Sequence, residues 1–208
     1  MEILTNNNTK LKKTSKKYNA NIYAFDLPAY KTKTGQITCP FADDCIKYCY
    51  ASKGAYTWLP AQNKHNLNYK LSQQENFTEL IQNDIDSKRK KITHIRLHSA
   101  GDFYSVKYLL KWLEIADKNP DIVFYAYTKS IPFFKNSKLI KLMLRHKQNF
   151  KVIFSYGSKK DNLINSIDRH AKIFNNESEL KKAGYINASE YDLIAINSTN
   201  KKIGLIYH

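Results

Sequence analysis

The sequence predicts an α/β fold in which parallel β-α units form a partial, open barrel. Three observations lead to this expectation. Apolar segments of strand and helix type alternate over residues 21–156, polar turns follow the strands, and one strand alternates polar with apolar side chains. Strands separated by helices pair in parallel through right-handed crossovers. Functional side chains are then expected at the carboxyl ends of the strands.

The length and composition favour one globular domain. The 208 residues, 42% of them hydrophobic and 13% aromatic, suit a single α/β domain over residues 21–208. Residues 1–20 are rich in Asn, Thr and Lys and predict a basic, disordered arm. Apolar runs stay well below the ~20 residues of a membrane helix, and Met1 is not followed by a signal-peptide core. We therefore expect a cytoplasmic protein without membrane contact.

The net charge of +16 arises from 34 Lys and Arg against 18 Asp and Glu. Such a charge is compatible with binding to nucleic acid, because many lysines attract a polyanion and release its counterions. It is equally compatible with an A+T-rich coding sequence, since the lysines are accompanied by many Asn, Ile and Tyr. A nucleic-acid partner is therefore one of two interpretations of the charge.

The predicted elements follow from hydrophobic periodicity and from Pro and Gly boundaries. In the first part of the chain they are a strand at 21–27, a helical region at 59–90, a strand at 92–97, a helix from 105 to about 119, a strand at 122–128, a helix at 140–145 and a strand at 151–156. Weaker patterns predict helices at 162–167 and 177–183 and strands at 171–174, 193–197 and 203–207.

The strand at 92–97 carries the argument for an open barrel. Alternation places His94, Arg96 and His98 on one side and Ile95 and Leu97 on the other. A doubly wound sheet would make both faces apolar, whereas a strand that lines a barrel interior has one polar face. This strand therefore indicates a half-barrel with a polar interior.

The cysteines lie together in the loop after the first strand. Cys39, Cys45 and Cys49 have the spacing C-x5-C-x3-C. A structural zinc site needs a fourth ligand, for which His98 is a candidate. An iron-sulfur cluster bound by three cysteines keeps one iron open to another ligand. The third interpretation is that the cysteines are inert buried thiols.

Polar residues follow the later strands. Arg96, His98 and Asp102 surround the second carboxyl end, where Gly101 permits close approach of a ligand. Arg96 either binds an anion or pairs with a carboxylate such as Asp26, and His98 is either functional or a core histidine. The third strand ends in Thr128-Lys129, where the lysine binds an anion or is one surface lysine among many, and the fourth ends in 155–157.

These motifs together resemble the phage gene product 88 family. The resemblance covers about residues 20–175 and is carried by Leu27-Pro28, Thr38-Cys39-Pro40, Cys45, Cys49-Tyr50-Ala51, the segment 96–103, Trp112 and the segment 126–130. The family in turn looks like a short relative of radical S-adenosylmethionine proteins.

The resemblance implies a [4Fe-4S] cluster on Cys39, Cys45 and Cys49. It also implies a turn at 99–102 that receives the amino group of S-adenosylmethionine, with Ser99, Gly101, Asp102, Thr128, Lys129, Arg96 and His98 around the cofactor. The usual spacing of the cluster cysteines is C-x3-C-x2-C, from which this chain departs. No cysteine follows Cys49, so a second cluster is not expected.

Two functional hypotheses result. The first is a phage-type iron-sulfur protein that is a radical S-adenosylmethionine-like enzyme of unknown substrate. The alternative is a non-enzymatic nucleic-acid-binding protein of phage replication with a structural zinc. Rolling-circle nucleases have one hydrophobic residue between their metal-binding histidines, whereas three residues separate His94 from His98. This departure argues against nuclease chemistry.

Overall fold

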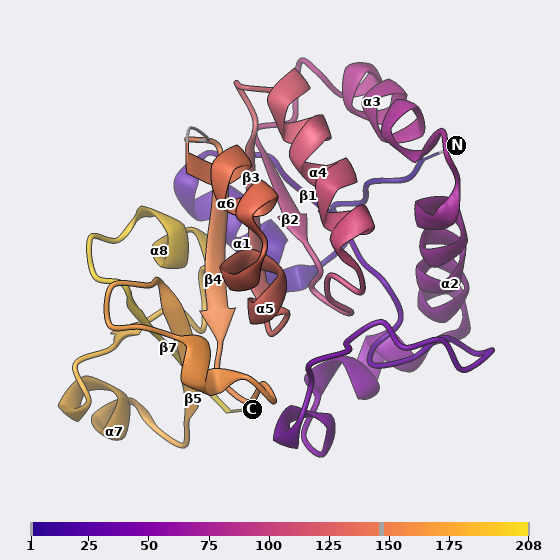
Figure 1. Cartoon of the computed structure of the whole chain (residues 1–208). Coiled ribbons are helices and arrows are strands. Elements are labelled where there is room, and N and C mark those ends of the chain that lie inside the picture. The colour runs from indigo at the N-terminus through magenta and orange to yellow at the C-terminus, as the bar shows by residue number, and fades with distance from the viewer. Residues whose placement is uncertain (1, 146–147, 208) are drawn as a thin grey trace.

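The structure is a computed structural model that describes residues 2–145 and 148–207. Within these residues it contains one open sheet of seven parallel strands in the order β1-β2-β3-β4-β5-β7-β6 (Figure 1). The strands are β1 Ile22–Phe25, β2 His94–Leu97, β3 Val123–Thr128, β4 Phe150–Ser155, β5 His170–Phe174, β6 Ile186–Asn187 and β7 Lys202–Ile206. The parallel β-α units are thus confirmed. The sheet does not close, since β1 and β6 form its two edges.

The helices are α1 Thr9–Tyr18, α2 Leu59–Gln73, α3 Phe77–Ser87, α4 Val106–Lys118, α5 Ile131–Asn136, α6 Lys138–Arg145, α7 Glu177–Lys182 and α8 Asp192–Asn197. The helical region expected at 59–90 is therefore two helices, separated at residues 74–76. The prediction of a strand at 193–197 is wrong, because these residues lie in α8. The expected helix at 162–167 is reduced to one 3-10 turn, Asp161–Leu163. No helix in the described ranges is long and apolar enough to cross a membrane.

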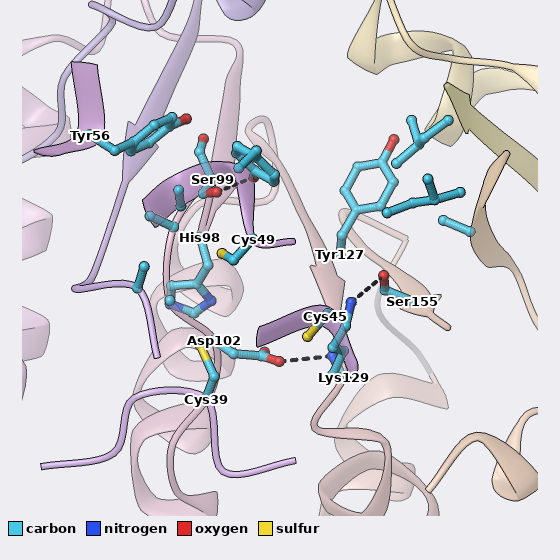
Figure 2. A pocket seen from close by; sticks show the side chains of 18 of the residues that line it. Cys39, Cys45, Cys49, Tyr56, His98, Ser99, Asp102, Tyr127, Lys129 and Ser155 are labelled. Carbon is cyan, nitrogen blue, oxygen red and sulfur yellow. Dashed lines mark hydrogen bonds between the residues drawn. The ribbon is translucent and has the colours of Figure 1, made fainter. Parts of the chain in front are cut away.

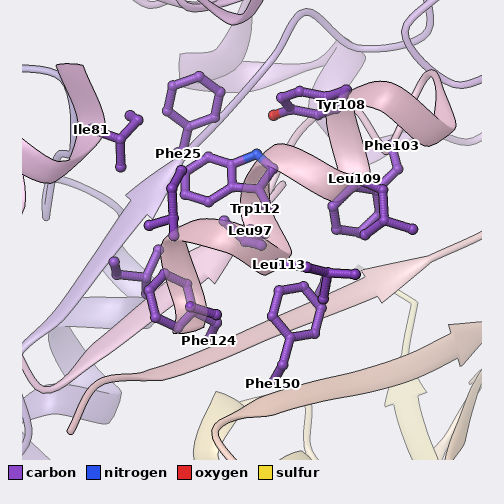
Figure 3. Packing of buried hydrophobic residues seen from close by; sticks show 14 of the residues in the cluster. Phe25, Ile81, Leu97, Phe103, Tyr108, Leu109, Trp112, Leu113, Phe124 and Phe150 are labelled. Carbon is purple, nitrogen blue, oxygen red and sulfur yellow. The ribbon is translucent and has the colours of Figure 1, made fainter. Parts of the chain in front are cut away.

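One face of the sheet carries the larger core. Trp112 of α4 is fully buried and packs edge-on against Phe25 and Phe77, with ring centroids 5.2 and 5.5 Å apart (Figure 3). Ile95 and Leu97 of β2 lie in the same cluster. The apolar side of β2 thus faces α3 and α4, as the alternation predicts. Aromatic rings make up a large part of this core, and their edge-to-face contacts add to the energy of burial.

The opposite face is covered by α1 and α8, whose Leu11 and Leu193 pack with Ala24, Tyr125 and Ile153 of the sheet. These two helices cover part of this face. The polar side of β2 faces this layer through Arg96, which pairs with Asp192 and also lines the cavity described below. The polar pattern of β2 therefore marks a buried ion pair beside a cavity on this face of the open sheet.

The basic arm expected at residues 1–20 is not observed as an arm. Ile3 and Leu4 are buried, and residues 9–18 form α1. Asn8 caps this helix by accepting a hydrogen bond from Leu11 N at 3.2 Å, and Asn19 ends it in the left-handed region. Leu11, 1% exposed, supplies the apolar contact to the sheet. Residues 9–18 thus form a helix with a cap at each end and a buried leucine, although their composition alone indicates disorder.

Candidate functional site

A cavity of about 420 Å³ lies at the carboxyl edge of the sheet, where the sequence predicts the site. The cysteine loop forms one wall, the turn after β2 a second, and the ends of β3, β4, β5 and β7 the others (Figure 2). Among the predicted site residues that line it are Cys39, Cys45, Cys49, Arg96, His98, Ser99, Gly101, Asp102 and Lys129. Thr128 is not part of the wall, but it contacts Asp102 from behind.

The cysteine loop is attached at both sides of the cavity. Thr38 Oγ1 donates to the carbonyl of Pro28 at 2.6 Å, which anchors the loop to the end of β1. On the other side Asp43 N donates to the carbonyl of Gly157 at 3.2 Å, and Ala42 forms a β-bridge with Ser158. The loop therefore spans the sheet edge from β1 to β4. This span brings all three thiols to the same cavity.

The thiols surround a shared space rather than converging on one point. Cys39, Cys45 and Cys49 are each half-buried, and their sulfur atoms border the same opening (Figure 2). In the described part of the chain, no three His, Cys, Asp or Glu side chains are grouped closely enough to hold a single metal ion. The arrangement therefore provides ligands at separate positions around the cavity.

The neighbours of the cysteines alter their acidity. Burial, together with the carboxylate of Asp102, raises the pKa of Cys39 to about 12. Burial also raises the pKa of Cys45, against the opposing effect of the Lys129 ammonium. Both thiols are hence protonated in the metal-free protein at neutral pH, and a bound metal would have to displace the protons.

Alkylation of Cys39 in the metal-free protein is therefore expected to be slow. At pH 8 iodoacetamide should modify Cys39 at least ~100-fold more slowly than a free cysteine with a pKa near 8.5, because almost no thiolate is present. Mass spectrometry of peptides at timed intervals measures the rate. The urea-unfolded protein is the control, in which Cys39 should react at the rate of a free thiol. A rate that is the same in the folded and unfolded chains would contradict the assignment.

The turn after β2 is held from below by Asp26. Its carboxylate accepts hydrogen bonds from Ser99 N at 2.6 Å and Ala100 N at 3.3 Å. His98 precedes this turn with φ of +63°, and Gly101 follows with φ of +81°. Left-handed conformation is unfavourable for a non-glycine residue such as His98, so the strain must be held by these contacts. The turn is a rigid wall of the cavity.

Strict alternation predicted that His98 points to the same side of the sheet as Arg96. The structure differs from this prediction. Its left-handed backbone turns the ring toward α4, where Nε2 lies 2.9 Å from Tyr108 Oη and the ring packs edge-on on Phe103. Burial, reinforced by Arg96, lowers the pKa of His98 to about 3. His98 is thus a neutral histidine at the boundary of core and cavity. Within the described residues, His98 and the cysteines are not grouped closely enough to share one metal ion.

Asp102 forms the floor below the thiols, and Thr128 supports it from behind. Asp102 accepts hydrogen bonds from Thr128 Oγ1 at 2.6 Å, Phe103 N at 2.7 Å and Lys129 N at 2.8 Å. These bonds fix the end of β3 against the turn after β2. Lys129 then extends its ammonium toward Cys45 and donates to Ser155 Oγ at 2.8 Å (Figure 2). Lys129 thus lies beside the cavity at the end of β3.

Arg96 pairs with Asp192 of α8, not with Asp26 as the sequence suggested. Lys10 of α1 also contacts Asp192 Oδ1 at 2.8 Å, and Tyr125 Oη donates to Oδ2 at 3.2 Å. Burial would raise the pKa of Asp192, but Arg96 and Lys10 hold it at about 2. Arg96 is thus a structural cation at the base of the cavity. Asp192 lies 96 residues away in the sequence, immediately before the segment 193–197 that predicted a strand.

Three tyrosines of the site were not predicted from the sequence. Tyr50 donates to the carbonyl of Ser99, and Tyr56 Oη accepts from Asn8 Nδ2 at 3.1 Å. Tyr127 Oη is buried and, like Ser99 Oγ, has no hydrogen-bond partner within the described residues. Tyr127 lies two residues after Tyr125 on β3, so both side chains point to the same face of the sheet. This alternation was the feature from which Tyr127 could have been predicted. Tyr50 stands in the motif Cys49-Tyr50-Ala51 that carries the family resemblance, whereas nothing distinguished Tyr56 among the 15 tyrosines.

These features define a parallel α/β protein whose cysteine-bearing loop closes a cavity at the carboxyl edge of the sheet. The chain belongs to the gene product 88 family, since the family profile described as "Gene product 88" matches residues 2–206. The family part of the sequence-based resemblance is therefore confirmed.

The chain is also similar to the "Gene 88 protein" of Mycobacterium phage L5. The two are 30% identical over 103 residues, which are 44% of this chain and 43% of that protein. The match thus spans less than half the length of the relative. No solved structure matches this chain. The comparisons accordingly establish the family.

Proposed function

We propose that this protein binds a [4Fe-4S] cluster through Cys39, Cys45 and Cys49 and accommodates S-adenosylmethionine beside it, as a radical S-adenosylmethionine-like enzyme. The observation that carries the proposal is that all three cysteines of the chain line one cavity at the carboxyl edge of a parallel sheet. The cysteine loop follows β1, and the rigid turn after β2 faces it. This order of loop and turn is the one that the resemblance implies.

The donor set suits a cluster better than a single ion. A structural zinc needs four ligands around one point, and the described residues offer no such group. A cluster presents its irons at separate corners, so thiols placed around a cavity can each bind one of them. Three cysteines leave one iron without a protein ligand. When bound, such a cluster would supply an electron for cleavage of a sulfonium.

The walls of the cavity suggest which residues would contact the cofactor. Ser99 Oγ is buried without a partner in the described structure and faces the cavity, so it is available to a ligand. Lys129 offers a cation beside Cys45. Asp102 and Thr128 already have protein partners and would act by positioning Lys129, and Arg96 is engaged with Asp192. Gly101 keeps the turn close to Leu27, within the wall.

Anaerobic purification tests the proposal. The wild-type protein is expected to be brown and to contain about four irons and four sulfides per chain. Cys45→Ala should lose the colour and most of the iron, because one of three ligands is missing. Tyr48→Phe is the matched control, since Tyr48 lies in the same loop and cavity wall but offers no sulfur. S-adenosylmethionine should change the electron paramagnetic resonance signal of the reduced wild-type protein.

Two results would overturn the cluster. One is stoichiometric zinc, which would favour the alternative of a nucleic-acid-binding protein with a structural metal. The other is iron content that is equal in the wild type and Cys45→Ala.

A further inference from the structure

The outer face of α1 is a row of lysines. Lys12, Lys13, Lys16 and Lys17 are exposed there, while Leu11 on the other side of the helix is buried. Lys10, by contrast, is engaged with Asp192. The helix is therefore fixed by its inner side and presents the four lysines together on its outer face. We call these four side chains the α1 lysine row.

The positive charge of the α1 lysine row is not neutralised within the described protein. Residues 9–18 include no Asp or Glu, and none of the four lysines has an ion pair in the described ranges. Lys12 and Lys16, and likewise Lys13 and Lys17, are four residues apart, so their like charges repel along the helix. This arrangement is unfavourable for the isolated helix. A polyanion bound to the row would relieve the repulsion.

A polar cleft of about 130 Å³ adjoins the α1 lysine row. Asn6, Lys12, Ser15 and Asn21 supply its polar wall. Amide, hydroxyl and ammonium groups are the side chains that contact phosphate oxygens in complexes with nucleic acid. The loop before β2 continues the basic surface, because Asn21 bonds to Thr93 and the exposed residues 90–91 are both lysines.

We propose that the α1 lysine row binds the phosphate backbone of duplex nucleic acid without reading its sequence. A membrane surface would need apolar side chains beside the lysines, but Leu11 is already packed in the core. Binding to single strands relies on aromatic side chains on which bases stack. Tyr18, the aromatic residue of α1, already lies edge-on against Tyr191. The available chemistry is thus contact between ammonium groups and phosphates.

Fluorescence anisotropy with a labelled 20-base-pair DNA duplex tests this proposal on the full chain. Each phosphate contact contributes about −0.9 to the slope of log K against log salt. Replacing Lys12, Lys13, Lys16 and Lys17 by Gln should therefore reduce the magnitude of the slope by about 3.6 and weaken binding at 50 mM salt at least ~30-fold. Glutamine has nearly the helix propensity of lysine, so α1 should remain folded.

The matched control removes the same number of charges elsewhere, at the exposed residues Lys138, Lys141, Lys172 and Lys182. This control should keep a slope within about 1 of the wild type. Equal losses in both variants would mean that net charge alone drives binding and would overturn the site. Stronger binding to vesicles with anionic phospholipid than to DNA, lost with the row, would overturn the nucleic-acid assignment. None of these results depends on a bound cluster.

Discussion

Gly101→Ala is expected to lower the free energy of unfolding by about 3 kcal/mol or more. A Cβ at this position would lie 2.5 Å from Leu27 Cβ and 3.2 Å from Leu27 Cα, and Gly101 has φ of +81°. Leu27 is fully buried, and its amide donates to the carbonyl of Ala100 at 2.9 Å. The neighbour therefore cannot move away, and strain in the backbone adds to the steric overlap.

Gly35→Ala is the matched control for this prediction. Gly35 also has positive φ, +91°, but a Cβ there would meet no atom within 4 Å. Only the conformational strain remains, which amounts to about 1 kcal/mol. Urea unfolding followed by circular dichroism compares the two variants. Equal destabilisation would show that the contact between the turn and Leu27 contributes nothing.

Asp192→Asn is expected to destabilise the protein by about 3 kcal/mol, because the guanidinium of Arg96 would remain buried without its counter-charge. The exposed pair Lys107–Glu75 provides the control: its side chains are 73% and 88% exposed, so Glu75→Gln should change stability by less than about 0.5 kcal/mol. The double variant Arg96→Met, Asp192→Leu should recover part of the loss, since it leaves no unpaired buried charge. Chemical denaturation at pH 7 measures all three.

The same pair predicts how stability depends on pH. Asp192 has a pKa of about 2 in the folded protein against an ordinary value of 3.8. Its contribution is therefore complete above pH 4 and is lost as the pH falls from 4 to 2, a change of about 2 kcal/mol. Asp192→Asn should lack this part of the acid profile. An acid profile that is unchanged in the variant would contradict the low pKa.

The sequence was sufficient for the repeated β-α units and for the edge at which the site lies. The strand ends were predicted at 97, 128 and 156 from apolar runs, the last within one residue of the observed end, and parallel pairing then places Lys129 and Ser155 together. The three cysteines were recognisable for the same reason, because they follow the first strand. Local patterns determine these features.

The features that were missed depend on contacts between distant segments. Residues 9–18 contain few apolar side chains, so the packing of Leu11 that makes them a helix against the sheet is not visible locally. Residues 193–197 form a mostly apolar run that suits a short strand or helix equally well, and in the structure they belong to α8, where Asp192 meets Arg96. The partner of Arg96 could not be chosen from spacing alone.

The contact between α1 and α8 has a consequence for biosynthesis. Asp192 N donates to Thr14 Oγ1 across 178 residues of sequence, so α1 leaves the ribosome long before its partner exists. At roughly 5–20 residues per second, this interval is about 10–40 s. During that time Arg96 of β2 and Lys10 of α1 lack their partner Asp192, and this face of the first strands is not yet covered by α8. The second face of the sheet can be completed only after α8 has been synthesised, which makes this face the last part of the domain to assemble.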